Sequence, residues 1–279
     1  MRSRITEKFD ELTGRDERAL VCYVVAGYPD VNTSHKVIDA LVRGGADIIE
    51  IGIPFSDPIA DGPTIQAASH TALERGITPE KALQISREVR KKYPKLPLLV
   101  MTYFNILVKP GVERFMLRAK ASGIDGFIVP DVPVEEAEVY LAAASKLALA
   151  TVFLASPNTS QGRLQKIVDS SSGFLYLVSV YGTTGARKSF EDYTLNAIKN
   201  VKQAALGKVP VAVGFGISTP SHARFMIGAG ADAVIVGSAI IDRIAKSRGR
   251  KMLSDLQDFA KAMKKACKKK QGKLEKDRL

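Results

Sequence analysis

Two carboxylates, Glu50 and Asp61, lie eleven residues apart in the segment DIIEIGIPFSDPIADGPTIQ, residues 47–66. The start of this segment, 47–53, is a short apolar run rich in β-branched residues, which predicts a buried strand. Glu50 lies in the middle of that run, and Asp61 follows on the loop, just before the Gly-Pro pair where a helix would begin. One acid on a rigid strand and a second on the next loop is an arrangement suited to proton transfer.

Each carboxylate also has a structural interpretation. A charged residue at the end of a strand is often exposed or ion-paired, and an aspartate before a helix is often an N-cap. For either residue alone, the structural interpretation is the better one. The catalytic interpretation therefore depends on what the rest of the chain places around the pair.

Composition indicates a globular protein with a full apolar core. The chain has 279 residues, of which 46% are hydrophobic, enough for one large α/β domain or two smaller ones. No apolar run approaches the roughly 20 residues of a membrane helix, and the charged N-terminal residues do not resemble a signal peptide. The two cysteines and three histidines are scattered, so we expect no disulfide, no metal site and a cytoplasmic location.

The net charge of +12 is concentrated at the C-terminus. Residues 243–279 hold 14 Lys and Arg against 4 Asp and Glu, so they account for +10 of the total. A basic tail leaves nucleic-acid binding open as an alternative role. An apolar stripe at helical spacing, Leu253, Leu256, Ala260, Met263 and Cys267, predicts instead a final helix packed on the body with its lysines in solvent.

Eight predicted strands alternate with helical sequence. They are 19–26, 47–53, 96–103, 124–129, 149–155, 173–180, 209–213 and 232–236. Strict alternation predicts a parallel sheet, and eight repeats at this length favour a closed (β/α)8 TIM barrel. An extra N-terminal helix at 3–13 and a basic C-terminal helix and tail complete the expected fold. We expect a single barrel domain over 1–268 and a frayed lysine-rich tail over 269–279.

A weak internal repeat supports the barrel. Three Gly-x-Asp triplets each end a helix and open a strand: Gly45-Ala46-Asp47, Gly123-Ile124-Asp125 and Gly230-Ala231-Asp232. Glycine provides a helix C-cap at such junctions, and the next apolar run begins at once.

A barrel of this kind carries its active site at the C-terminal ends of its strands. Glu50 and Asp61 follow the second strand, and Tyr176 lies in the sixth, where it could equally be ordinary packing. The glycine-punctuated loop 181–187 fits either a mobile lid or a long turn. The loops Gly214-Phe215-Gly216 and Gly237-Ser238, after the last two strands, predict a phosphate site.

Several chemistries lack their residues in this sequence. No lysine ends a predicted strand, so a Schiff-base mechanism has no nucleophile. No cluster has metal-ligand spacing, and no dinucleotide fingerprint follows the first strand. Acid–base catalysis by carboxylates on a phosphorylated ligand remains.

The motif EIGIPFSDPIADGPTIQ, from Glu50 to Gln66, resembles the signature of the tryptophan synthase alpha subunit family. Supporting matches are Ala26-Gly27-Tyr28-Pro29, Tyr103-Phe104-Asn105, Pro130-Asp131-Val132-Pro133, Tyr176, Thr184-Gly185, Gly214-Phe215-Gly216-Ile217 and Gly237-Ser238-Ala239. The resemblance covers about residues 3–265. Departures from the family pattern are Val25, Ile106, Tyr181 and Thr183.

The resemblance implies retro-aldol cleavage of indole-3-glycerol phosphate to indole and glyceraldehyde 3-phosphate. It implies that Glu50 shuttles protons, that Asp61 accepts a hydrogen bond from the indole N–H, and that Tyr176 assists Glu50. It also implies a set of substrate-binding residues. These are Tyr23, Met101, Tyr103 and Phe215 lining the pocket, and Thr184, Gly185, Gly214, Gly216, Gly237 and Ser238 in the loop 181–187 and at the phosphate.

The resemblance further implies a beta subunit that holds pyridoxal phosphate, condenses indole with serine and completes an alpha2beta2 tetramer. Pro54 and Asp57 would lie near that interface, and this chain would hold no cofactor of its own. Two alternatives remain at this point. One is another phosphosugar-binding barrel enzyme, such as an isomerase, and the other is a catalytically weak allosteric partner of a beta subunit.

Overall fold

The computed structural model describes residues 3–178, 187–214 and 216–268 of the chain. All strands in these ranges join one parallel sheet, in the order β5-β4-β3-β2-β1-β9-β8-β7-β6. The strands are β1 Ala19–Val25, β2 Ile48–Gly52, β3 Leu98–Met101, β4 Gly126–Ile128, β5 Ala150–Val152, β6 Leu154–Ala155, β7 Leu175–Val178, β8 Val211–Gly214 and β9 Ala233–Val236.

The two ends of this sheet are one stretch of chain. Strands β5 and β6 are the halves of the predicted fifth strand, separated only by Phe153. β5 pairs with β4 through Gly126 and Ala150, and β6 pairs with β7 through Leu154 and Tyr176. The sheet therefore closes on itself, and the predicted (β/α)8 barrel is confirmed, with the ninth strand arising from the interruption at Phe153.

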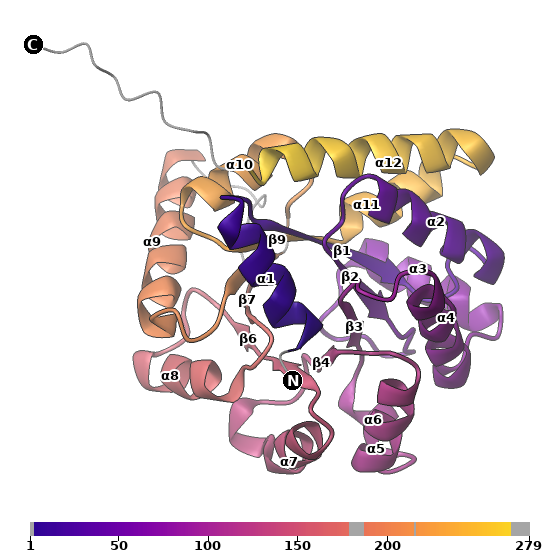
Figure 1. The fold of residues 1–279 in the computed structure, drawn as a ribbon, viewed down its shortest axis with the longest axis horizontal. Helices are drawn as coiled ribbons and strands as arrows, with labels where there is room; N and C mark the ends of the chain where they lie inside the picture. Colours follow the sequence, from indigo (N-terminus) through magenta and orange to yellow (C-terminus); the bar gives the residue numbers. More distant parts are fainter. Residues whose placement is uncertain (1–2, 179–186, 215, 269–279) are drawn as a thin grey trace, which may run out of the picture.

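Helices surround the barrel as an outer ring, apart from α1, which lies across one end of it (Figure 1). They are α1 Arg4–Gly14, α2 Val31–Arg43, α3 Pro63–Glu74, α4 Pro79–Lys92, α5 Phe104–Val108, α6 Val112–Ala121, the 3-10 turn η1 Val134–Glu136, α7 Glu138–Lys146, α8 Gln161–Ser170, α9 Arg187–Ala205, α10 Pro220–Gly228, α11 Ser238–Lys246 and α12 Gly249–Ala266. The helical sequence after the last strand is two helices, because Ser247 and Arg248 are extended between them.

The third strand is shorter than predicted. It ends at Met101 instead of Tyr103, because the backbone N–H of Phe104 bonds to the carboxylate of Asp131 and the chain turns into the short helix α5. The apolar run that predicted a longer strand does not reveal this change of direction, since the partner aspartate lies 27 residues away.

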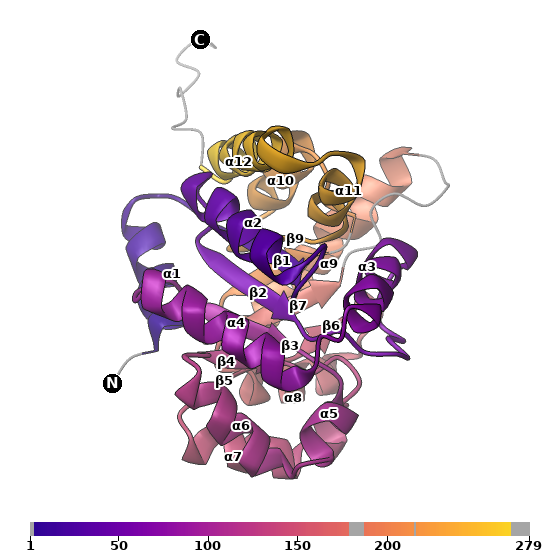
Figure 2. The ribbon, with the colours of Figure 1, turned by 90° about the vertical axis from the view of Figure 1, so that its right-hand side faces the viewer.

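Two apolar cores lie on the two faces of the sheet. The outer core fills the space between strands and helices and includes Ile49 and Ile51. The inner core fills the barrel, includes Ile48 and Leu99, and continues into Ile5, Phe9 and Leu12 of α1. Phe9 meets Phe174 edge-on, with ring centroids 6.2 Å apart. Helix α1 thus covers the end of the barrel where the strands begin, and Figure 2 shows it at the end opposite α3.

The Gly-x-Asp repeat closes the same end of the barrel. Its glycines have left-handed backbones, with φ of +102° at Gly45, +87° at Gly123 and +107° at Gly230. Each aspartate accepts a 2.8 Å hydrogen bond from the N–H at or near the start of the neighbouring strand: Asp47 from Leu20, Asp125 from Leu98 and Asp232 from Val211. The repeat is therefore a device that ties adjacent strand starts together.

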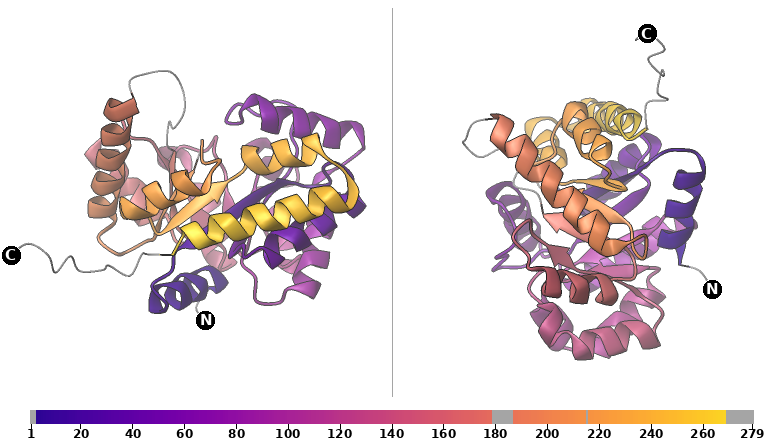
Figure 3. Two further views of the ribbon diagram at one scale, coloured as in Figure 1. Left: turned by 90° about the horizontal axis from the view of Figure 1, so that it is seen from above. Right: turned by 90° about the vertical axis from the view of Figure 1, so that its left-hand side faces the viewer.

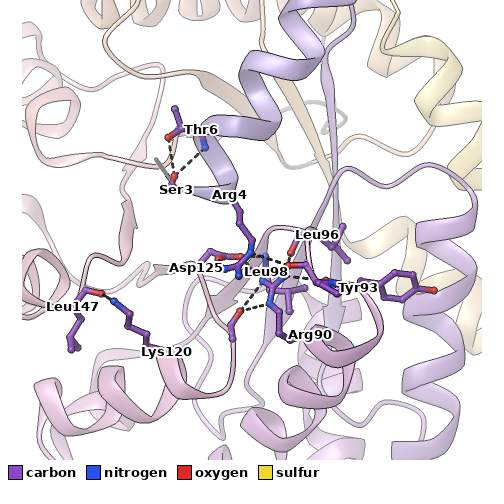
Figure 4. Close-up of polar contacts among 12 residues, drawn as sticks. Ser3, Arg4, Thr6, Arg90, Tyr93, Leu96, Leu98, Lys120, Asp125 and Leu147 are labelled. Carbon is purple, nitrogen blue, oxygen red and sulfur yellow. Dashed lines mark hydrogen bonds and ion pairs between the residues drawn. The ribbon is translucent and has the colours of Figure 1, made fainter. Parts of the chain in front are cut away.

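Each of these aspartates is also paired with a cation. Asp47 pairs with Lys264 at 2.8 Å, and Asp232 pairs with Lys202 at 2.6 Å. Asp125 pairs with Arg4 at 2.7 Å and Arg90 at 2.6 Å, so it links α1, α4 and the start of β3 (Figure 4). This end of the barrel holds the fold together and leaves the opposite end for chemistry.

The final helix packs on the barrel as its apolar stripe predicted. Leu256, Ala260, Met263 and Cys267 are buried, and Leu253 is half-buried. Helix α12 packs against α2 and runs along the outer ring (Figure 3). The predicted frayed tail, 269–279, lies outside the described residues. Across the ranges that the structure describes, none of the helices has both the length and the apolar character to span a membrane.

Candidate active site

A cavity of about 420 Å³ opens where the strands end, on the side of the barrel opposite α1. It is lined by Tyr23, Glu50, Ala60, Asp61, Gly62, Pro63, Thr64, Ile65, Met101, Ile128, Leu154, Tyr176, Gly216, Ile217, Ile235, Gly237 and Ser238. A mostly apolar cavity of this size with a few converging polar groups is typical of a small-molecule site.

Glu50 points into the cavity because β2 alternates. Its neighbours Ile49 and Ile51 belong to the outer core, so the carboxylate between them faces the barrel axis. Glu50 is 1% exposed, and within the described part of the chain its Oε2 has no hydrogen-bond partner. Burial, and next the nearby Asp61 charge, raise the pKa of Glu50 to about 8. The Glu50 carboxyl is therefore mainly protonated at neutral pH.

Asp61 is held at the cavity mouth by the loop between β2 and α3. Its carboxylate accepts a 3.0 Å hydrogen bond from the Tyr103 hydroxyl, and its N–H donates to the Pro58 carbonyl oxygen at 3.0 Å. Gly62 is the N-cap of α3 and makes no side-chain cap bond, so the N-cap interpretation of Asp61 is wrong. Burial raises the pKa of Asp61 to about 6, and the Tyr103 hydrogen bond opposes that rise. Asp61 is mainly ionised at neutral pH.

The Glu50 and Asp61 carboxyl groups thus differ in charge at neutral pH. Glu50 is an acid with a proton to donate, and Asp61 is an anion able to stabilise a positive charge. Environments that separate the pKa values of two carboxyl groups in one site are a sign of acid–base division of labour. Across the described ranges, no cluster of His, Cys, Asp and Glu could hold a metal ion.

Sequence comparison then identifies the family. A sequence model described as "Tryptophan synthase alpha chain" matches residues 9–268. This chain belongs to the tryptophan synthase alpha chain family. The resemblance drawn from residues 50–66 is confirmed, and with it the assignment of the chain as the lyase of the alpha reaction.

Individual members of the tryptophan synthase alpha chain family match over nearly their whole length. The alpha chain of Aquifex aeolicus is 45% identical over 261 residues, which are 94% of this chain and 97% of that one. The solved alpha subunit of Legionella pneumophila is 33% identical with a TM-score of 0.88, covering 96% of this chain and 99% of the other. A tryptophan synthase structure from M. tuberculosis, in an aminoacrylate-bound form, gives 32% identity and a TM-score of 0.84, covering 95% and 100%.

Most of the catalytic and substrate-binding residues predicted from the family resemblance line the cavity. Tyr23, Glu50, Asp61, Met101, Tyr176, Gly216, Gly237 and Ser238 all line it. Gly214 and Tyr103 do not. Gly214 instead lies against the ring of Tyr176, where an added Cβ would be 2.5 Å from the ring carbon Cζ. Thr184, Gly185 and Phe215, like the departures Tyr181 and Thr183, lie outside the described residues.

The two residues predicted near a partner differ in exposure. Pro54 is buried within the chain, whereas Asp57 is exposed on the loop that carries Asp61. On the same loop Ile59 is 82% exposed. Of the two predicted residues, therefore, Asp57 is the one free to contact a partner.

Sequence reasoning missed the apolar wall of the cavity. Ile65, Ile128, Leu154, Ile217 and Ile235 line it without having been singled out. Ile128, Leu154 and Ile235 lie at or next to strand ends and face inward. The period-two alternation of each predicted strand, counted from its C-terminal end, was the signal that could have found these three residues.

Tyr23 lies against Gly52 much as Tyr176 lies against Gly214. A Cβ on Gly52 would overlap the Tyr23 hydroxyl and lie 2.6 Å from its Cζ. Tyr23 is buried, so the ring would have to move into the cavity. We expect Gly52→Ala to lower the free energy of unfolding by about 1–3 kcal/mol, the usual effect of overpacking. Chemical denaturation measures this, and Gly162→Ala, where an added Cβ meets nothing, is the control. Equal stability of the two variants would contradict the packing described.

Proposed function

We propose that this chain cleaves indole-3-glycerol phosphate in the cavity at the end of the barrel, with Glu50 and Asp61 as its reacting groups. The observation that carries the proposal is the pair itself. A protonated glutamic acid, whose Oε2 has no hydrogen-bond partner among the described residues, and an ionised aspartate line one cavity in a chain of this family.

The reaction needs one proton delivered and one removed. Protonated Glu50 donates to indole C3, which turns the ring into an indolenine cation that can accept electrons. The Glu50 carboxylate then takes the proton of the glycerol hydroxyl next to the ring. Its O–H electrons form the aldehyde C=O, and the carbon–carbon bond breaks toward indole C3. Indole and glyceraldehyde 3-phosphate leave, and Glu50 is protonated again, ready for the next turnover.

Asp61 stabilises the charge that this step creates. Its anion accepts a hydrogen bond from the ring N–H, and the attraction grows as the ring becomes cationic. An interaction that is stronger in the transition state than in the ground state is one that accelerates the chemical step. The ring itself accepts the electrons, so the reaction needs no cofactor as an electron sink.

The phosphate occupies the part of the cavity formed by Gly216, Gly237 and Ser238. Ser238 begins α11, and the N–H groups of the first turn of a helix attract anions. The apolar residues on the opposite wall receive the indole.

A negative side chain at residue 237 tests the phosphate position. We expect Gly237→Asp to weaken binding of glyceraldehyde 3-phosphate by about tenfold or more, because its carboxylate would repel the phosphate. Gly237→Asn, which has the same size and no charge, is the matched control and should retain most of the affinity. Calorimetric titration measures both. Equal losses in the two variants would place the phosphate elsewhere.

We further propose a beta subunit as partner, with Asp57 and the exposed loop around it at the contact. The partner holds pyridoxal phosphate, joins indole to serine, and forms an alpha2beta2 tetramer with this chain in the cytoplasm. Family membership supports the partnership. Asp57 and Ile59 are both exposed on the loop that carries Asp61, so they are accessible to a partner.

Indole release from indole-3-glycerol phosphate tests the proposal. The purified chain should release indole slowly alone and markedly faster with a beta subunit. Formation of a different phosphosugar product would favour the isomerase alternative. Tight binding of the beta subunit without any indole release would favour a catalytically weak allosteric partner.

A further inference from the structure

Tyr103 was predicted to line the substrate pocket, but it lies behind the catalytic loop. It is 3% exposed and is absent from the cavity wall. Its hydroxyl accepts a 3.1 Å hydrogen bond from the N–H of Ala60 and donates a 3.0 Å hydrogen bond to the Asp61 carboxylate. One buried hydroxyl therefore contacts both the backbone and the side chain of the loop that carries Asp61.

The Asp61 loop needs such a contact. Ser56, Asp57 and Ile59 are exposed, so burial does little to fix this part of the loop. The side chain of Gln66 donates to the Asp61 carbonyl oxygen at 2.8 Å and anchors the loop to its own helix. Tyr103 links the Asp61 carboxylate to a different loop, the one that follows β3.

Tyr103 is in turn held in place by a contact from the loop after β4. Both carboxylate oxygens of Asp131, which follows β4, accept the N–H of Phe104 at 3.0 Å. This fixes the start of α5, where Tyr103 is the N-cap. On its other side, the Tyr103 ring stacks on Phe55 with centroids 5.1 Å apart and planes at 25°. Contacts therefore run from the loop after β4, through the loop after β3, to the loop after β2.

We propose that Tyr103 is a positioning residue for Asp61, and that Asp131 sets the position of Tyr103. We call this set of residues, Asp131, Tyr103, Ala60 and Asp61, the Tyr103 clamp. The clamp holds the Asp61 carboxylate where it meets the ring nitrogen of the substrate. The inference deepens the proposed function, because it rests on Asp61 acting on the substrate.

The clamp acts on the charge of Asp61 as well as on its place. The Tyr103 hydroxyl donates to the ionised carboxylate and so favours its charged form. Three other titratable groups lie near this carboxylate, and the Asp61 charge contributes to the raised pKa of each: Glu50 of β2, Tyr23 of β1 and Tyr176 of β7. None of these three makes a hydrogen bond to Asp61 among the described contacts.

Tyr103→Phe in the full chain with its beta subunit tests the clamp. We expect kcat for indole release to fall about 10- to 100-fold with KM little changed, since misplacing a reacting group by a fraction of an ångström costs this much. The acid limb of the pH profile should move to higher pH, because ionised Asp61 loses a donor, while the alkaline limb stays. The same substrate is used throughout, so its own ionisation cancels in the comparison.

Tyr140→Phe is the matched control. It removes another buried tyrosine hydroxyl, one that donates to the Phe127 carbonyl oxygen at 3.2 Å, and neither of these two residues lines the cavity. It should change neither kcat nor the pH profile. An unshifted acid limb in Tyr103→Phe, or the same loss in Tyr140→Phe, would overturn the proposal.

Asp131→Ala tests the second half of the proposal, that Asp131 sets the position of Tyr103. It should lower kcat less than Tyr103→Phe does, and the double variant should be no worse than Tyr103→Phe alone. Losses that multiply would show that Asp131 does not act through Tyr103.

Carbon-13 titration of the Asp61 carboxyl in the chain alone gives a readout without turnover. In that titration, a raised Asp61 pKa in Tyr103→Phe supports the clamp whether or not the parent chain releases indole. A parent chain that releases no indole would instead reject the proposed function.

Discussion

Glu50→Gln should lower the turnover number of indole release by about 10²-fold or more, the usual contribution of a general acid–base group. The amide has nearly the same shape as the carboxylic acid, so it fills the same buried position between Ile49 and Ile51. It cannot give a proton to indole C3 or take one from the glycerol hydroxyl. Substrate binding should change little, because the loss falls on the chemical step.

Steady-state kinetics with a saturating beta subunit measure this effect. Glu138→Gln is the control, since Glu138 is exposed on α7 outside the cavity. Near-parental turnover in Glu50→Gln would remove Glu50 from the mechanism. A large rise in KM with unchanged kcat would make it a binding residue instead.

The same substitution should also change how stability depends on pH. Below pH 4.5 the Glu50 carboxyl is protonated in both the folded and the unfolded chain. Between pH 4.5 and about 8 only the unfolded chain releases this proton, so the folded state loses stability as the pH rises. The loss is at most about 1.4 kcal/mol per pH unit, because one proton is involved.

Glu50→Gln removes this dependence. We expect the variant to be increasingly more stable than the parent as the pH rises from 4.5 toward 8, with the difference in unfolding free energy levelling above that range. Denaturant titrations of the isolated chain across that range measure it. Parallel curves for the two proteins would mean that Glu50 ionises in the folded chain as it does in water. Such a stability cost at a reacting group is a common compromise between activity and stability.

The sequence predicted those parts of the site that depend on local pattern. Period two along β2 directs Glu50 inward, and the alternation of strand and helix places it at the end of the barrel where chemistry occurs. In the sequence, the Gly-x-Asp repeat indicated only where helices end. In the structure, its aspartates accept hydrogen bonds from backbone N–H groups at or near the start of neighbouring strands. The hydrogen bonds that reveal this join residues 21 to 27 positions apart, which no local pattern encodes.

Tyr103 shows why the rest could not be predicted. Its distance from Asp61 is 42 residues in sequence, and its orientation depends on Asp131 in a third loop. The strand that precedes it ends early for the same reason. From sequence alone, a tyrosine near a strand end is expected to line the pocket. Its actual direction depends on the geometry of the loop, which the local sequence pattern does not encode.

The pH profile of kcat/KM for indole release, measured with the full chain and its beta subunit, tests the central claim most directly. That claim is that Glu50 works protonated while Asp61 works ionised. The account predicts a bell-shaped profile with an acid limb near pH 6 and an alkaline limb near pH 8. The alkaline limb should be absent from the residual activity of Glu50→Gln. Activity that keeps rising well above pH 8 in the parent would mean that ionised Glu50 starts the reaction, and would contradict the division of roles.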